Sequence, residues 1–158
     1  MDRGLGRGTV VCSALVLLIV VFAGCGGGGD STTEGDISKA AVLKQGNAIC
    51  AKGNAAIEHA AAKQFPKGGV EPRRSAQVRF IAVTVVPNLE AQIDALQALG
   101  TPAGDEGTVD TFLTEAENAL LVVKKDPSVM TTGGPGPFAG ADKFATSYGL
   151  TACGFNAE

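Results

Sequence analysis

The segment Val42–Ala61 (VLKQGNAICAKGNAAIEHAA) decides the fold, because it carries one apolar stripe at helical spacing. Apolar or small residues recur every three or four positions, which places them on one side of an α-helix. We expect this helix to span Ile37–Gln64, with the Asp36 carboxylate accepting the free amide hydrogens at its start. The stripe consists of Val42, Gly46, Ile49, Cys50, Gly53, Ile57, Ala60 and Ala61.

Two glycines on this stripe predict close packing. Gly46 and Gly53 each cost roughly 1 kcal/mol in helix propensity. The missing side chains let a neighbouring helix come nearer, so we expect both positions to lie at close helix contacts. Cys50 lies on the same stripe and is expected to face inward, where the C-terminal tail can reach it.

Three further segments have helical spacing, and they predict helices over Ser75–Leu99, Asp105–Lys125 and Phe138–Tyr148. Pro87 interrupts the first of them, because proline removes a backbone hydrogen bond and clashes with the preceding turn; a kink or two abutting helices should result. The expected fold is all-α, an antiparallel bundle of about four helices in one domain, residues 36–158.

The turns and buried faces of these helices follow from the same pattern. Prolines and paired glycines predict a loop over Phe65–Arg74, and Gly149 with Leu150 predicts a Schellman ending for the last helix. The expected inward-facing residues are Val78, Ile81, Ala82, Val85, Leu89, Ile93, Leu96, Leu99, Val109, Phe112, Leu113, Ala116, Leu120, Val123, Phe138, Ala141, Phe144, Ala145 and Tyr148.

The first 24 residues resemble the signal peptide of bacterial lipoproteins. Arg3 and Arg7 precede an apolar run of about 15 residues, shorter than the ~20 that a permanent transmembrane helix needs. The run ends in Val20–Cys25 (VVFAGC), which resembles a lipobox: small residues fit the processing peptidase just before a cysteine that carries the lipid. We expect residues 1–24 to be removed and Cys25 to be acylated, the alternative being an uncleaved N-terminal anchor.

Residues 25–35 are expected to be a flexible tether. The segment is rich in glycine and polar residues and has little to bury. About 10 residues of such chain typically span roughly 16–19 Å, enough to keep a folded domain clear of lipid headgroups.

The remaining cysteines form an even pair once the leader and the lipid are accounted for. Cys12 leaves with the leader and Cys25 takes the lipid, so Cys50 and Cys153 remain in an oxidising compartment. We expect a disulfide between the first helix and the C-terminal tail. Buried free thiols and a metal pair are the alternatives, although a metal would need two more ligands and His59 is the only histidine.

Charge is distributed unevenly along the chain. The formal net charge of −3 does not indicate nucleic-acid binding. Basic residues dominate the first half and acidic residues the middle. This pattern has two interpretations: intramolecular complementarity with solvated faces, or a basic patch over Lys63–Arg79 that contacts anionic headgroups or an acidic partner.

No catalytic or cofactor motif stands out. Glu115 and Glu117 are two residues apart, so they point to different faces of their helix and do not form an acid–base pair. His59 lacks a nucleophile or co-ligands, and we expect no enzyme activity, no cofactor and no metal site. The irregular segment Asp126–Pro137 is either a mobile connector or the rim of a ligand site.

Two stretches together resemble a known group of proteins. Leu43–Asn54 (LKQGNAICAKGN) and Tyr148–Gly154 (YGLTACG) are similar to the opening "AIC" helix and closing "YGL..CG" tail of small uncharacterised secreted or lipid-anchored actinobacterial proteins. Leu96–Pro102 (LQALGTP) also fits the helix-stop of that group. The resemblance implies a helical domain with paired cysteines and no particular activity.

These observations together predict a lipoprotein anchored in the cell membrane through Cys25, on its extracytoplasmic face. The expected role is a non-catalytic binding or scaffold module with an envelope protein as partner. The alternative is a small-molecule or lipid carrier with a pocket between the last three helices, which would require an apolar cavity of several hundred Å³.

Overall fold

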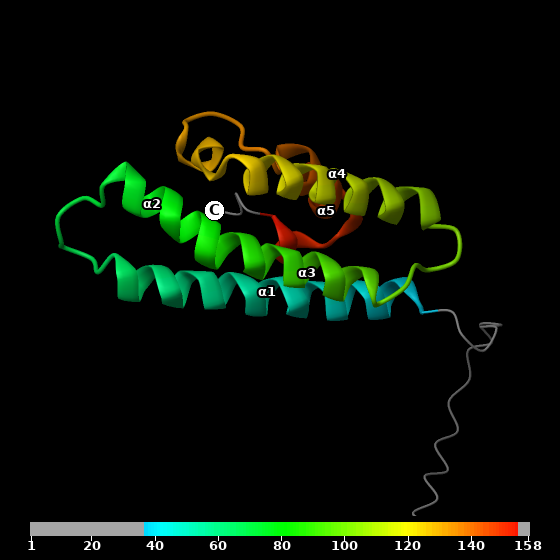
Figure 1. The fold of residues 1–158 in the computed structure, drawn as a ribbon. Helices are drawn as coiled ribbons and strands as arrows, with labels where there is room; N and C mark the ends of the chain where they lie inside the picture. Colours follow the sequence, from blue (N-terminus) through cyan, green and yellow to red (C-terminus); the bar gives the residue numbers. More distant parts are fainter. Residues whose placement is uncertain (1–36, 155–158) are drawn as a thin grey trace, which may run out of the picture. The chain divides into compact units, whose positions relative to one another are not determined.

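The structure, a computed structural model, describes residues 37–154, and the described part is all-helical. Four helices run alongside one another as an antiparallel bundle in this part, as the sequence predicts (Figure 1). The second helix contains a π-helical turn, and two short 3₁₀ segments complete the fold. The elements are α1 (Lys39–Gln64), α2 (Arg74–Phe80), η1 (Ile81–Val85), α3 (Val86–Gln97), α4 (Glu106–Lys125), η2 (Pro127–Thr131), α5 (Ala139–Tyr148) and η3 (Thr151–Cys153).

The start of α1 differs from the prediction. The helix begins at Lys39, and Ser38 is its N-cap: the Ser38 hydroxyl accepts a hydrogen bond from the Ala41 amide at 3.2 Å. The prediction of Asp36 as the cap was therefore wrong by two positions. Serine and aspartate cap helices about equally well, so residue type alone did not separate the two candidates.

The loop between α1 and α2 is present as predicted. Phe65, at the end of α1, makes an edge-to-face contact with Phe80 of α2, with ring centroids 5.4 Å apart. This aromatic pair fixes the hairpin beneath the loop.

The predicted interruption of the second helix is a π-helical turn. The Val86 amide donates to the Ile81 carbonyl five residues back, and Pro87 follows within the first turn of α3. The wide turn accommodates Pro87, which has no amide hydrogen to donate to the preceding turn. Ala82, within this turn, is exposed, contrary to the prediction, while Phe80 before the turn and Val86 after it are buried.

The core lies between α1, α3, α4 and α5. Helix α3 packs on α1 on one side and on α4 on the other, and α5 packs on α4. The predicted inner face of α4 is confirmed, with Val123 fully buried at its C-terminal end. Helix α5 buries Ala141, Ala145 and Tyr148 as predicted.

The Schellman ending of α5 is confirmed. The Leu150 amide donates to the Ala145 carbonyl, and the Gly149 amide to those of Ala145 and Thr146. Gly149 has a φ of 104°, which favours glycine because a Cβ would be strained there. Leu150 folds back into the core, and the chain then turns through η3 toward α1.

The segment Asp126–Pro137 is more ordered than an irregular connector. Its first half forms η2, where the Asp126 carboxylate accepts a hydrogen bond from the Ser128 amide at 2.9 Å. This segment packs against α2, α4 and η1, and Val129 and Met130 pack on the core.

Candidate functional site

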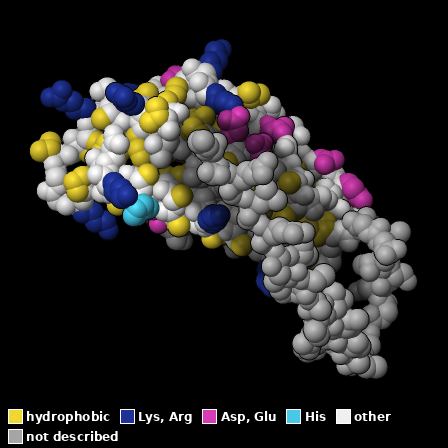
Figure 2. Space-filling view, turned by 60° about the horizontal axis from the view of Figure 1, so that its bottom comes forward, with side chains coloured by type: hydrophobic (Ala, Val, Ile, Leu, Met, Phe, Trp, Pro, Cys, Tyr) yellow, Lys and Arg dark blue, Asp and Glu magenta, His cyan; other side chains and the backbone are white. Residues whose placement is uncertain are grey.

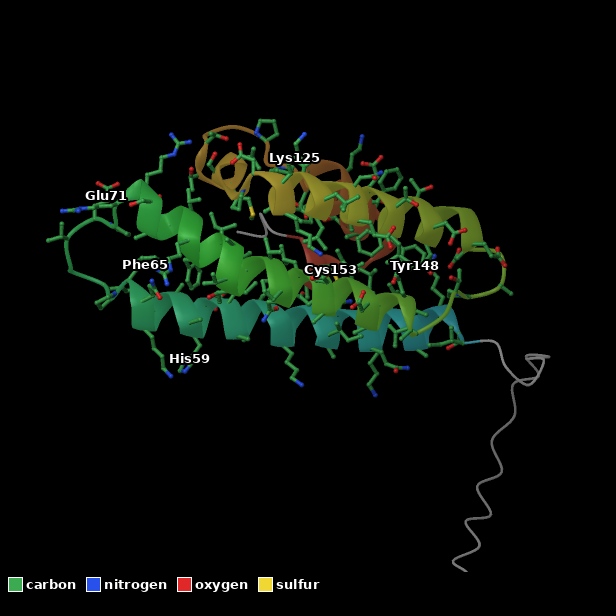
Figure 3. All side chains as sticks on the ribbon, viewed as in Figure 1. His59, Phe65, Glu71, Lys125, Tyr148 and Cys153 are labelled. Atoms are coloured by element: carbon green, nitrogen blue, oxygen red, sulfur yellow. A yellow bond between two sulfur atoms is a disulfide. The ribbon has the colours of Figure 1, made fainter. Side chains whose placement is uncertain are left out.

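A disulfide joins Cys50 of α1 to Cys153 of η3, as the sequence predicts. The two Cα atoms are 4.9 Å apart, and the bond spans 103 residues of chain. Both cysteines are buried, with 2% and 8% of their surface exposed, and Figure 3 shows Cys153 between the helices. The bond excludes the two alternatives for this pair, free thiols and a metal site.

Two asparagines of α1 hold the tail on either side of the disulfide. The Asn47 amide group donates to the Gly149 carbonyl at 3.0 Å, and its oxygen accepts from the Ala152 amide at 2.8 Å. Asn54 donates to the Ala152 carbonyl at 2.9 Å. We call Cys50, Cys153, Asn47 and Asn54 the clasp.

Sequence reasoning did not predict the two asparagines of the clasp. Their signal was their spacing: Asn47 lies three residues before Cys50 and Asn54 four residues after it, so all three share one helix face. An asparagine near an inward-facing cysteine can hydrogen-bond to backbone groups of the segment that carries the partner cysteine, because its side chain contains both donors and an acceptor.

The two helix glycines make the close contacts that were expected. A Cβ at Gly46 would lie 2.6 Å from Cδ2 of Leu150, which is nearer than real Cβ contacts. A Cβ at Gly53 would lie 2.2 Å from Cδ of Gln92. Gly46 therefore makes room for the returning tail, and Gly53 makes room for α3.

The interior leaves little room for a ligand. The cavity between the helices has a volume of about 30 Å³ and is lined by the disulfide, Gln92, Phe112, Phe138 and other core residues. That volume suits a water molecule or two, whereas ligand pockets span roughly 300–1,000 Å³. Gln92 is the one buried polar side chain in the described range, and it donates to Asn88 at 2.9 Å.

A second set of polar contacts fixes the start of α1. The Lys39 ammonium lies 3.2 Å from the Asp105 carboxylate and 4.2 Å from the centre of the Tyr148 ring. The Tyr148 hydroxyl donates to Asp105 at 2.8 Å. This hydrogen bond, followed by the Lys39 charge, lowers the pKa of Asp105; burial and then the Asp105 contact raise the pKa of Tyr148 to about 12.

The predicted rim segment Asp126–Pro137 borders a hollow on the outside of the bundle. This hollow of about 390 Å³ lies against α4, and its lining includes Glu115, Val122 and Pro135. It does not lie between the helices, where the carrier alternative placed its pocket. An open hollow of about 510 Å³ lies between α1, η1, η2 and the tail, and one of about 270 Å³ lies over Gly53.

The two predicted charge regions lie on different elements. The eight Lys and Arg residues of 37–79 belong to α1, α2 and the loop between them; residues 80–123 contain seven Asp and Glu and no Lys or Arg. Figure 2 shows basic side chains over the face that carries the single histidine, with acidic side chains gathered elsewhere. Lys39 is the only one of the eight for which the described part of the chain supplies an ion pair.

Other predicted features lie outside the described residues or are absent from them. Cys25, the leader and the tether fall within residues 1–36, which the structure does not describe. Within 37–154, none of the helices has both the length and the apolar character needed to cross a membrane. The same range contains no cluster of three or more His, Cys, Asp or Glu arranged to hold a metal ion.

No family model matches the chain, and neither the curated proteins nor the solved structures contain a match.

Proposed function

We propose that the chain is a membrane-anchored extracytoplasmic lipoprotein, processed before Cys25 and acylated on that residue. The Cys50–Cys153 disulfide carries the proposal, because structural disulfides persist in oxidising compartments outside the cytoplasm. The disulfide also uses both cysteines of the folded part, so neither of them is a partner for Cys25, the last residue of the lipobox-like segment. The clasp residues fall in the two stretches that resemble the actinobacterial group, which supports a proposed kinship with it.

The proposed role of the folded part is that of a non-catalytic binding or scaffold module for an envelope partner. The filled core supports this role, because the interior cavity of about 30 Å³ is too small for a typical ligand. The pKa of Tyr148 is raised and that of Asp105 is lowered, and the two side chains bind each other, so they act as a structural contact. A carrier that encloses its ligand in the core would require the helices to separate, because the hollow of about 510 Å³ between α1, η1, η2 and the tail is open to solvent.

The anchor can be tested with Cys25→Ser in the full chain, expressed in a host that processes lipoproteins and fed labelled palmitate. The variant should lose the label and keep residues 1–24, because the lipobox then lacks the cysteine that processing requires. The matched control, Cys12→Ser, should keep the label and lose the leader, because Cys12 lies within the apolar run. A Cys25→Ser chain that is still labelled would contradict the proposal.

The binding role can be tested by crosslinking in native envelopes, followed by organic extraction of the purified protein. A single envelope protein crosslinked at stoichiometric yield would support a scaffold. A stoichiometric small molecule or lipid in the extract, other than the lipid on Cys25, would instead establish the carrier.

A further inference from the structure

The outer face of α1 carries a straight row of basic side chains. Lys44, Lys52, His59 and Lys63 are all exposed and fall within about 100° of one another around the helix axis. The row extends about 29 Å from Lys44 to Lys63 at the α-helical rise. Figure 3 shows His59 pointing away from the bundle.

The lysines of this row have no counter-ions in the described part of the protein. The ion pairs found there are Lys39–Asp105 and Lys124–Glu90, and neither involves the row. Glu58 is the single acidic residue of α1, and the acidic residues of 80–123 belong to other elements. Intramolecular complementarity therefore does not account for the row.

We propose that the outer face of α1 lies on an anionic phospholipid surface, with Lys44, Lys52 and Lys63 contacting the phosphate headgroups. This inference rests on the proposed lipid anchor. Helix α1 directly follows the tether predicted for residues 25–35, whose typical span of roughly 16–19 Å is less than half the ~39 Å length of α1. The anchor thus keeps α1 near the membrane, and the lysine charges determine which side faces it.

The row fits a lipid surface better than an acidic protein. Protein interfaces depend on large side chains that fill pockets, and the exposed residues between the lysines, apart from His59, are small, polar or, at one position, acidic: Gln45, Ala48, Ala51, Ala55, Ala56, Glu58 and Ala62. The large exposed hydrophobic residues of the described range are elsewhere, at Val70, Val83, Leu121 and Val122. Lysine ammoniums on flexible stems bind headgroups as point charges and need no fixed geometry.

The loop after α1 continues this surface. Val70 is 99% exposed, and its neighbours in the loop include Lys67 and Arg73. The immediate neighbours of Val70 are Gly69 and Glu71, and the two cations of the loop outnumber its one carboxylate. A lone apolar side chain in a loop of net positive charge suits the boundary between headgroups and acyl chains.

The test is an amine footprint of the full chain, purified from membranes with its lipid and reconstituted into vesicles. One set contains phosphatidylcholine alone and the other contains 30% phosphatidylglycerol. An impermeant amine reagent should label Lys44, Lys52 and Lys63 about fivefold more slowly on the anionic vesicles, which corresponds to ~1 kcal/mol per lysine. Labelling of Lys143 on α5 should not change, and 1 M salt should abolish the difference.

Two variants with the same change in charge make the test specific. Lys44→Gln/Lys52→Gln/Lys63→Gln should remove the protection of Lys67, whereas Lys124→Gln/Lys125→Gln/Lys143→Gln should retain it. Equal labelling of the row on both vesicle types would overturn the proposal. Protection in native envelopes but not on pure lipid would also overturn it, in favour of an acidic partner.

Flotation separates failure of this inference from failure of the anchor. Binding to phosphatidylcholine vesicles reports the lipid on Cys25 alone, because these vesicles carry no net charge. A chain that does not float with them lacks the anchor, and the proposed function then fails. The difference in flotation between anionic and neutral vesicles at low salt still measures the α1 face in that case.

Discussion

The two faces of α1 differ in how closely the rest of the molecule constrains them. On the inner face, Gly46, Cys50 and Gly53 are buried against the tail and α3, and a single added methyl group would collide. On the outer face, Lys44 and Lys52 make no hydrogen bond or ion pair in the described structure. One helix therefore separates residues that define the fold from residues that are free to meet a surface, and substitutions should affect the two faces differently.

The largest effect on the inner face should come from the disulfide. Cys50→Ala/Cys153→Ala should lower the free energy of unfolding by about 2–5 kcal/mol, because the crosslink closes a loop of 103 residues in the unfolded chain. Urea unfolding with and without reductant measures it. Reduced wild type should match the double variant, and a difference between oxidised wild type and the variant below about 0.5 kcal/mol would contradict the prediction.

A methyl group at Gly46 should have the next largest effect. Gly46→Ala should destabilise by about 1 kcal/mol, because the clash with buried Leu150 outweighs the gain in helix propensity. Gly107→Ala in α4 is the matched control: nothing lies within 4 Å of its Cβ position, so this variant should be up to about 1 kcal/mol more stable. Equal shifts in the urea midpoint would show that Gly46 is not a packing glycine.

The asparagines of the clasp should differ from each other. Asn47→Ala removes two hydrogen bonds to the tail and should cost about 1–3 kcal/mol, because tail backbone groups lose their partners. Asn54→Ala removes one such hydrogen bond and should lower the free energy of unfolding by less. Both variants should also speed reduction of the disulfide by dithiothreitol, Asn47→Ala more strongly, and unchanged reduction rates would mean that the tail does not depend on them.

The contact between Tyr148 and Asp105 should give a pH signature. The pKa of Tyr148 is raised from 10.0 to about 12, so its contribution to stability is present below pH 10 and is lost as the pH rises toward 12. The pKa of Asp105 is lowered from 3.8, so its contribution is present above that pH and is lost as the pH falls through the folded value. Tyr148 is the only tyrosine and tryptophan is absent, so ultraviolet titration reads it directly.

The folded protein should titrate near pH 12 and the urea-unfolded protein near pH 10. In Asp105→Asn the folded midpoint should fall toward 10, because the carboxylate charge that opposes ionisation is gone. A folded wild-type midpoint at 10 would mean that the hydroxyl is in solvent.

The smallest effect on stability should come from the outer face. Lys44→Gln/Lys52→Gln/Lys63→Gln should change the free energy of unfolding by less than about 0.5 kcal/mol per site, since these side chains are exposed and make no hydrogen bond or ion pair in the described structure. Ala48→Gln, on the same face without a charge change, is the control. A loss of several kcal/mol would mean that this face takes part in the fold.

The features that the sequence predicted are those with a strong local signal. Apolar periodicity located the four helices, the even cysteine pair predicted Cys50–Cys153, and the costly helix glycines predicted close packing at Gly46 and Gly53. The helices and the packing glycines follow from residue type and spacing along one helix, whereas the disulfide follows from the number of cysteines left once Cys12 and Cys25 are assigned elsewhere.

The features that the sequence did not predict depend on contacts between distant segments. Ala82 lies within the π-helical turn, and a regular helical period wrongly placed it inside. The Tyr148–Asp105 hydrogen bond joins residues 43 positions apart, and the Asn47 bonds reach the tail across more than 100. Single polar residues have no periodicity, so the sequence does not show where their partners lie.

The most direct test of the central claim is the intact mass of the protein extracted from membranes, with and without reduction and alkylation. We expect a chain that begins at Cys25, carries added acyl mass, and gains about 2 Da on reduction as Cys50–Cys153 opens. Alkylation should then modify those two cysteines and leave the acylated Cys25 unmodified. A chain of full-length mass without lipid, and with Cys25 open to alkylation, would contradict it.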